Sequence, residues 1–185
     1  MRDEPRSADV WVHPSLEVRP SAIGGHGLFA IAAIDTGVVV IRLGGRLVST
    51  AELHRMFDEA TDDHDVDTVA VDVDVHLVLP AGTVAHYANH DCEPTMWPLD
   101  SYELATRVPV AVDDELTLDD GLISADPTFR MGCTCGAVTC RSVVTGEDWR
   151  RPELVQRYGG HWPTGLQRRI DALAGHAPKR RQLDR

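Results

Sequence analysis

The four cysteines of this 185-residue chain are the residues whose type and spacing most clearly predict chemistry. Cys133, Cys135 and Cys140 lie in the run CTCGAVTC, where one residue separates the first two. That spacing is poor for a disulfide but suits chelation, and Gly136 frees the backbone to turn Cys140 back toward the same centre. A structural zinc site takes four ligands, so we expect Cys92, the remaining cysteine, to be the fourth. The alternative is a cysteine-lined loop without metal, in which the thiols are oxidised.

A second group of potential ligands lies in VAVDVDVHLVLP, residues 69–80. Strict alternation predicts one strand with Asp72, Asp74 and His76 on one face and valines on the other. These three side chains could hold a metal ion, but nothing nearby in the sequence completes a ligand set. We therefore prefer a half-buried antiparallel strand with a polar outer face. The next segment, HYANHDCEPTMW, is unusual for a loop because it gathers two histidines, an asparagine and a cysteine within seven residues.

The elements that must position these residues in the first two thirds of the chain are short. Residues 16–50 contain β-branched runs broken by glycine pairs, a pattern typical of strands and tight turns. Ser49 and Glu52 form an S-x-x-E capping box, which predicts a short helix over residues 51–60. An acidic loop is expected at 61–67. Further along, residues 101–121 predict two more strands joined by an acidic turn.

The last part of the chain predicts helices. One should open near Pro152 and stop at Gly159, and another should cover the segment LQRRIDALAG, in which apolar residues recur at helical spacing. The basic end, residues 176–185, is expected to be frayed. Three aromatic residues of this region, Trp149, Tyr158 and Trp162, are more typical of a small core than of a ligand site.

Composition limits the class of protein. With 43% hydrophobic and 25% charged residues, the chain should bury a single core. It carries no apolar stretch long enough to span a bilayer and no secretory signal, so we expect a cytoplasmic protein without membrane attachment. The formal net charge of −11 makes nucleic acid an improbable partner and leaves basic partners open.

Four motifs occur in an order that resembles the SET-domain family, which consists mainly of S-adenosylmethionine-dependent protein-lysine methyltransferases. They are SAIGGHGLFA (21–30), NHDCEP (89–94), ELTLDDG (115–121) and CTCGAVTC followed by Arg141. The first three are similar to the family's G-x-G-L-F-A, N-H-S-C-x-P and E-L-T-x-D-Y-G signatures, and the last to its post-SET cysteine motif. The similarity covers about residues 15–145, and the stretch that follows resembles the tail of some bacterial members.

The resemblance implies a mainly β fold of small curved sheets with few short helices. It also implies a pseudoknot in which the NHDC segment passes near the ELTLDDG strand and carries Cys92 toward the other cysteines. The zinc would then fix the post-SET segment over the active site and couple folding to metal loading. The expected organisation is a polar lead-in (1–14), a SET domain (15–122), a post-SET zinc segment (123–145) and a helical tail (146–185).

The resemblance further implies a binding site for S-adenosylmethionine. In the glycine motif the backbone would approach the methionine part of the cofactor, and Asn89 and His90 would hydrogen-bond its amino and adenine groups. His86 and Tyr87 stand where the family usually has Arg-Phe. The expected cofactor-binding residues are therefore Gly25, His26, Gly27, His86, Tyr87, Asn89 and His90.

One departure from the family's pattern falls at its most constant tyrosine, where this sequence has Asp120. A phenol is neutral at pH 7, whereas a carboxylate brings a charge that attracts a sulfonium or a cationic substrate. Burial could raise its pKa and make it a proton acceptor. We predict Asp120 and Tyr87 as the catalytic residues. Two alternatives are a slipped strand that turns Asp120 to solvent and a tyrosine from elsewhere, such as Tyr158, that fills the gap.

Three functions follow from these observations. The first is a protein-lysine methyltransferase with an atypical active site, whose acidic body suits a basic protein segment. The second is a repurposed S-adenosylmethionine-dependent enzyme acting on a small molecule. The third is a module that binds cofactor or a partner without chemistry.

Overall fold

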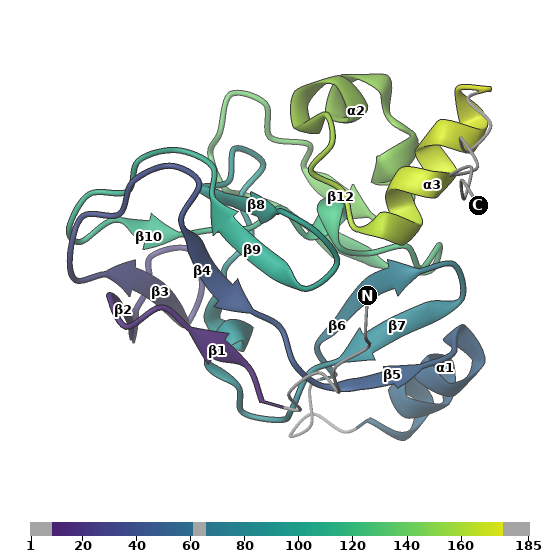
Figure 1. Cartoon of the computed structure of the whole chain (residues 1–185), viewed down its shortest axis with the longest axis horizontal. Helices are drawn as coiled ribbons and strands as arrows, with labels where there is room; N and C mark the ends of the chain where they lie inside the picture. The colour runs from purple at the N-terminus through teal and green to yellow at the C-terminus, as the bar shows by residue number, and fades with distance from the viewer. Residues whose placement is uncertain (1–8, 61–65, 176–185) are drawn as a thin grey trace, which may run out of the picture.

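The strands of the computed structural model, which describes residues 9–60 and 66–175, form small antiparallel sheets (Figure 1). The largest has the order β1–β4–β9–β8, with bounds Trp11–Val12, Val39–Arg42, Glu103–Thr106 and Met96–Pro98. The second has the order β10–β3–β2, with bounds Glu115–Leu116, His26–Ala30 and Leu16–Pro20. The third has the order β5–β7–β6, with bounds Arg46–Val48, Val75–Val78 and Thr68–Asp72. The last pairs β11 (Arg130–Gly132) with β12 (Val143–Thr145).

Helices are few and short, so the mainly β fold expected from the sequence is confirmed. The α-helices are α1 (Thr50–Glu59), α2 (Pro152–Tyr158) and α3 (Thr164–Leu173), and single 3-10 turns are η1 (Val84–Tyr87), η2 (Asp120–Leu122) and η3 (Asp148–Arg150). Within the described ranges, no helix combines the length and apolarity needed to cross a membrane.

All three predicted helices form, but only the ends of α2 are confirmed: α1 covers Thr50–Glu59 where 51–60 was predicted, and α3 covers Thr164–Leu173 where 166–175 was predicted. The Ser49 hydroxyl accepts a hydrogen bond from the Glu52 backbone N–H at 3.2 Å, as an N-cap should. The Glu52 carboxylate pairs with Arg46 instead of returning to the Ser49 N–H, so only half of the capping box forms. Helix α2 begins at Pro152 and ends before Gly159, whose φ of 54° is a conformation that glycine adopts readily.

The single strand predicted over residues 69–80 is wrong, because the segment folds into the hairpin β6–β7. Asp74 lies in the turn with a φ of 56°, and this turn separates the residues expected on one face. Asp72 pairs with Arg168 at 2.6 Å, Asp74 accepts the Thr50 N–H, and His76 contacts the Thr50 hydroxyl. Asp74 and His76 thus share Thr50 as a partner, whereas Asp72 is engaged by α3.

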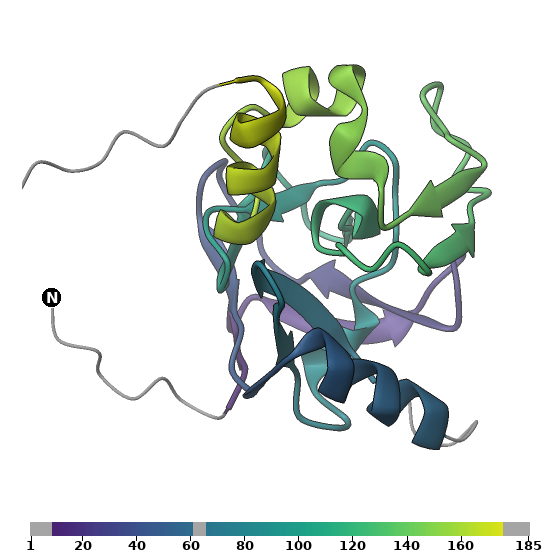
Figure 2. The same ribbon diagram turned by 90° about the vertical axis from the view of Figure 1, so that its right-hand side faces the viewer.

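The C-terminal helices build a second core against the sheet of β6. Trp149, Tyr158 and Trp162 are 4%, 1% and 3% exposed and pack with apolar residues of η2, α2 and α3, which confirms their interpretation as core residues. Helix α3 approaches β6 so closely that a Cβ on Gly165 would lie 2.4 Å from the backbone of Asp72. Figure 2 shows α2 and α3 side by side above the sheets. The described part of the tail, residues 146–175, is thus part of the folded body.

The segment that carries the NHDC motif pairs with the ELTLDDG segment. His90 and Leu118 form a parallel bridge, in which the Leu118 N–H donates to the Asn89 carbonyl at 2.9 Å and the Asp91 N–H donates to the Leu118 carbonyl at 3.0 Å. This pairing places Cys92 beside the β11–β12 sheet. Most of the predicted acidic loop (61–65) and the basic end (176–185) lie outside the described residues.

Candidate functional site

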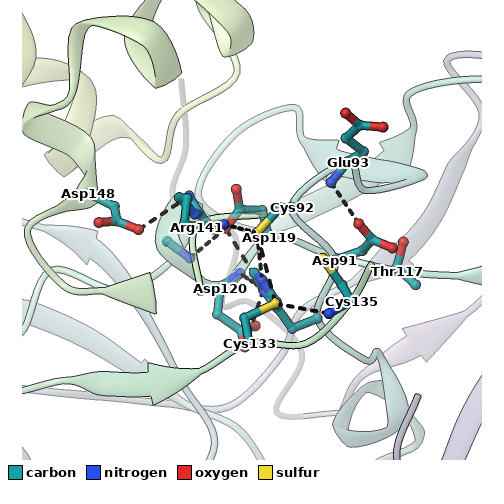
Figure 3. Close-up of polar contacts among 12 residues, drawn as sticks. Asp91, Cys92, Glu93, Thr117, Asp119, Asp120, Cys133, Cys135, Arg141 and Asp148 are labelled. Carbon is teal, nitrogen blue, oxygen red and sulfur yellow. Dashed lines mark hydrogen bonds and ion pairs between the residues drawn. The ribbon is translucent and has the colours of Figure 1, made fainter. Parts of the chain in front are cut away.

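All four cysteines come together, although they are spread over 49 positions of the chain. Their sulfur atoms lie within 4.8 Å of one another, with Cys133 Sγ 3.9 Å from Cys92 Sγ and 3.8 Å from Cys140 Sγ. Thiolates held about 2.3 Å from a tetrahedral centre are separated by about 3.8 Å. Disulfide sulfurs would be about 2 Å apart. The spacing in this cluster therefore fits ligands of one metal ion; Figure 3 shows Cys92, Cys133 and Cys135 of the cluster.

Backbone N–H groups point to two of the sulfur atoms. The backbone N–H of Cys135 lies 3.4 Å from Cys133 Sγ, and that of Arg141 lies 3.5 Å from Cys92 Sγ. Burial raises the pKa of the Cys133 thiol to about 12, whereas a backbone hydrogen bond to Ser142 lowers the pKa of Cys140. Four crowded thiols of this kind favour a divalent cation that holds them as thiolates.

Next to the cluster lies a buried group of charges that sequence reasoning missed. Asp119, with no exposed side-chain surface, pairs with the guanidinium of Arg141, whose Nη1 lies 3.2 Å from Asp148 Oδ2. The other oxygen of Asp119 accepts the Tyr158 hydroxyl at 2.7 Å. Burial raises the pKa of Tyr158, so this phenol remains a neutral donor. Asp119 and Arg141 each belong to a motif in the sequence, but nothing in the sequence indicated that the two side chains form a pair.

Asp120 lies on the wall of the cavities, which disagrees with the alternative of a slipped strand that turns it to solvent. Its side chain is 27% exposed and lines two cavities, of about 520 Å³ and about 190 Å³. Burial, with a smaller contribution from the neighbouring charge of Asp119, raises the pKa of Asp120 to about 7. Tyr158 does not fill the position of the missing tyrosine, because its hydroxyl is bound to Asp119 in the core.

The two cavities share one wall, made of Asp67, Thr68, Asp120 and Ile123. The larger cavity opens between α1 and the start of β11 and is bordered by Phe57 and Phe129. No tyrosine is among the described residues that line either cavity. A space of this size suits a small-molecule ligand or an extended side chain.

The glycine motif and Asn89, predicted to bind cofactor, do lie together. The Asn89 amide nitrogen donates to the His26 carbonyl at 2.9 Å and to Glu115 Oε1 at 2.7 Å. Gly25 has a φ of 45° and open space around it. At Gly27 a Cβ would lie 2.1 Å from Glu115 Oε1. The glycine therefore leaves room for the Glu115 carboxylate. Glu115 is a further residue of this region that the sequence reasoning did not single out.

The three remaining predicted cofactor residues are divided between this region and the interior. The Tyr87 ring packs edge-on against His26, with centroids 5.8 Å apart, and lines neither cavity. His86 lines the smaller cavity and bonds through Nδ1 to Asp67 at 2.8 Å. His90 is enclosed, and burial lowers its pKa; its ring contacts the Asp120 N–H and Cys92 Sγ.

No family model matches the chain. Its sequence is similar to histone-lysine N-methyltransferase 2B of Homo sapiens, 31% identical in an alignment 139 residues long that covers 65% of this chain and 5% of that protein. It is also similar to histone-lysine N-methyltransferase ATX2 of Arabidopsis thaliana, 30% identical in an alignment 138 residues long that covers 67% of this chain and 12% of that protein. The chain thus spans a small part of the length of these relatives.

Solved structures show which fold the chain adopts. The methyltransferase domain of human histone-lysine N-methyltransferase SETMAR matches 72% of this chain and 58% of its own, with a TM-score of 0.57 and 21% identity. KRYPTONITE in complex with mCHG DNA and SAH matches 70% of this chain and 28% of its own, with a TM-score of 0.53 and 23% identity. The fold is that of SET domains. Together with the order of its motifs, this makes the chain a SET-domain protein with a post-SET cysteine cluster.

Proposed function

We propose that the protein transfers a methyl group from S-adenosylmethionine to a lysine amine of a protein, with Asp120 as the group that receives the amine proton. The observation that carries the proposal is the position of the Asp120 carboxylate on the wall common to both cavities. The names of the sequence relatives, the SAH in one structural neighbour and the SET fold support the cofactor and the reaction type. The acidic body supports a basic protein segment as the partner.

In this proposal Asp120 and its neighbour Asp67 attract the lysine, and Asp120 accepts its proton. A lysine arrives as an ammonium ion, and the carboxylates of Asp120 and Asp67 on the shared wall attract it. The ammonium must lose a proton before its nitrogen can attack, and a carboxylate with a pKa of about 7 accepts that proton better than an ordinary aspartate does. Bound S-adenosylmethionine supplies the electrophilic methyl group. Transfer of that methyl group would form the new C–N bond and break the C–S bond, with S-adenosylhomocysteine as the other product.

The residues proposed to hold the cofactor lie around Asn89. The backbone of Gly25 and His26 and the rings of Tyr87 and His86 border this region. The side chains of Asn89 and His90 are already engaged within the protein, so contacts from their stretch of chain would come from main-chain groups. Tyr87, which lies outside both cavities, has a packing role in this proposal.

We further propose structural zinc as the ion of Cys92, Cys133, Cys135 and Cys140. Tetrahedral thiolate spacing and the N–H donors around the sulfurs support it. The ion would tie the NHDC segment to the β11–β12 sheet and has no direct part in the reaction. The cytoplasmic location expected from the sequence stays a prediction.

A second candidate function is methyl transfer to a small cationic molecule. It is favoured by the larger cavity, whose volume of about 520 Å³ falls in the range of small-molecule sites, and by the absence of tyrosine from the described lining. The chemistry at Asp120 would be the same. The two candidates differ in whether the acceptor is a protein or a metabolite.

The deciding experiment follows the cofactor. Zinc-loaded protein is incubated with S-adenosylmethionine alone, with a protein fraction of a lysate and with a metabolite fraction, and mass spectrometry identifies S-adenosylhomocysteine and the methylated product. We expect methylated lysine in the protein fraction. The rate should rise about tenfold per pH unit below pH ~7 and level off above it, because the ionised Asp120 accepts the proton.

Two variants make this experiment specific. Asp120→Asn should lower kcat by about 100-fold or more while the protein still binds cofactor. Asp35→Asn, which changes an exposed carboxylate elsewhere, should leave turnover unchanged. Methylation only in the metabolite fraction would select the second candidate. Cofactor that is bound but never consumed would reject both candidates and identify a binding module, and full turnover in Asp120→Asn would remove Asp120 from the mechanism.

A further inference from the structure

Two short series of contacts connect the cysteine cluster with Asp120, and the proposed reaction uses neither. One passes through the imidazole of His90 and the other through the guanidinium of Arg141. Both side chains are enclosed, at 7% and 4% exposure, so water does not compete for their contacts. Figure 3 shows Arg141 between Asp148 and the Asp119–Asp120 segment, with Cys92 beside them.

The imidazole of His90 makes a contact through each ring nitrogen. Nδ1 lies 3.2 Å from the backbone nitrogen of Asp120, and it must be the acceptor because a backbone N–H can only donate. A neutral imidazole that accepts at Nδ1 carries its hydrogen on Nε2. Nε2 lies 3.4 Å from Cys92 Sγ, so its N–H points to a sulfur of the cluster. No ring nitrogen is left for a bound ligand.

Arg141 makes the second connection. It directly follows Cys140, its backbone N–H lies 3.5 Å from Cys92 Sγ, and its guanidinium pairs with Asp119 Oδ1. The same Asp119 oxygen accepts the Gly121 N–H at 2.9 Å and thereby caps η2, the turn that holds Asp120. The side chain that fixes this turn is therefore held by the residue next to a cysteine.

We propose that His90 and Arg141 are positioning residues that hold η2, and with it Asp120, in place when a metal ion draws the four cysteines together. This inference rests on the proposed function, in which Asp120 accepts the amine proton. Loss of the ion would release Cys92 and Cys140, and both contacts with the Asp119–Asp120 segment would loosen.

A matched pair of variants at His90 separates the two ends of the first connection. Asn places its amide oxygen near the position of Nδ1, so His90→Asn keeps an acceptor for the Asp120 N–H but loses the donor to Cys92. Gln places its amide nitrogen near the position of Nε2, so His90→Gln keeps that donor but loses the acceptor. Each zinc-loaded protein is tested by chelator competition for zinc affinity and by NMR hydrogen exchange at single amides.

We expect opposite results from the pair. His90→Asn should weaken zinc binding about 10- to 100-fold and keep protection of the Asp120 amide. His90→Gln should keep zinc affinity and speed exchange of the Asp120 amide about tenfold or more. The Leu118 amide, bonded to the Asn89 carbonyl, is the internal reference and should not change. Unchanged Asp120 exchange in His90→Gln would overturn the role of His90.

Zinc removal tests the coupling as a whole. In the natural sequence, stripping the metal should speed exchange at Asp120 and Gly121 more than at Val110, which is bonded to Ile34 far along the chain from the cysteines. An equal increase at Val110 would show that the metal acts on the entire fold, and would overturn the proposal. These measurements need no turnover, so failure of this inference and failure of the proposed methyl transfer give different results.

Discussion

At the scale of single residues, Asp120 is where this protein departs furthest from the motif it resembles. A phenol would be neutral throughout the physiological range, whereas this carboxyl group changes charge near pH 7. Its negative form is disfavoured by burial and by the adjacent negative charge of Asp119. The protein therefore holds, at the boundary of its cavities, a group whose charged form lowers its stability.

This cost predicts a pH-dependent gain in stability for Asp120→Asn. The pKa of Asp120 is about 7 in the folded state and near the ordinary value of 3.8 when unfolded, so the stability its protonated form confers is lost as pH rises between these values. The free energy of unfolding of Asp120→Asn, relative to the natural sequence, should therefore increase by about 1 kcal/mol per pH unit from pH ~5.5 to ~7 and then level off.

Urea unfolding at several pH values, with zinc in the buffer, measures this difference. The exposed Asp35→Asn is the control and should show no such trend. A constant difference between Asp120→Asn and the natural sequence across this pH range would contradict the raised pKa.

At the scale of elements, the turn between β2 and β3 is fixed by one carboxylate. Glu115 accepts hydrogen bonds from the Ser21 hydroxyl at 2.9 and 2.8 Å and from the Asn89 amide at 2.7 Å, directly over Gly27. A methyl group on Gly27 would displace this carboxylate and break both sets of contacts. The glycine motif therefore connects three segments that are distant in sequence.

Gly27→Ala should accordingly destabilise the protein by about 2 kcal/mol or more, because the hydrogen bonds of a partly buried carboxylate are lost. Gly24→Ala is the matched control, since its Cβ would lie at an ordinary 3.6 Å from Asn89 Oδ1. Thermal unfolding measures the stability of both variants, and a binding assay measures their affinity for the cofactor. Equal stability of the two variants would show that Glu115 can move away without cost.

The elements that could be predicted from the sequence are those whose signal is local. Ser49 caps α1, Pro152 and Gly159 bound α2, and the cysteine spacing predicts a common centre for residues that the fold then brings together. The β6–β7 hairpin escaped prediction because alternation continues through its turn, and only the backbone conformation of Asp74 reveals the reversal.

The site was less predictable because its key contacts are not local. Asp119 meets Arg141 and Tyr158 across 22 and 39 positions, and no spacing rule relates them. Likewise, the motif predicted His90 as a cofactor residue, but its environment in the fold directs the ring to Cys92 and to the Asp120 N–H.

At the scale of the whole molecule, the C-terminal helices complete both the core and the site. Tyr158 donates to the buried Asp119 carboxylate, and the Arg157 guanidinium donates to the Cys92 carbonyl at 2.8 Å. Leu154, Leu166 and Ile170 complete the second core. A protein ending at Gly146 should therefore fail to fold cooperatively and should bind zinc poorly, because it loses this apolar surface and leaves Asp119 without its phenol partner.

A protein ending at Gly175 is the control and should keep a single unfolding transition and one bound zinc. Calorimetry and metal analysis compare the two truncations. A cooperative transition in the shorter protein would show that residues 9–146 form an independent folding unit.

The pairing of β3, at residues 26–30, with β10, at residues 115–116, limits how early the protein can fold during its synthesis. Until residues 115–116 have been added, β3 can pair with β2 on one edge but has no partner on the other edge, and Asp119 has its Tyr158 partner only when residue 158 has been added. Contacts between segments so distant in sequence form slowly and leave apolar strands exposed in the meantime. We therefore expect a newly made chain of this protein to complete its folding only once the C-terminal helices have emerged.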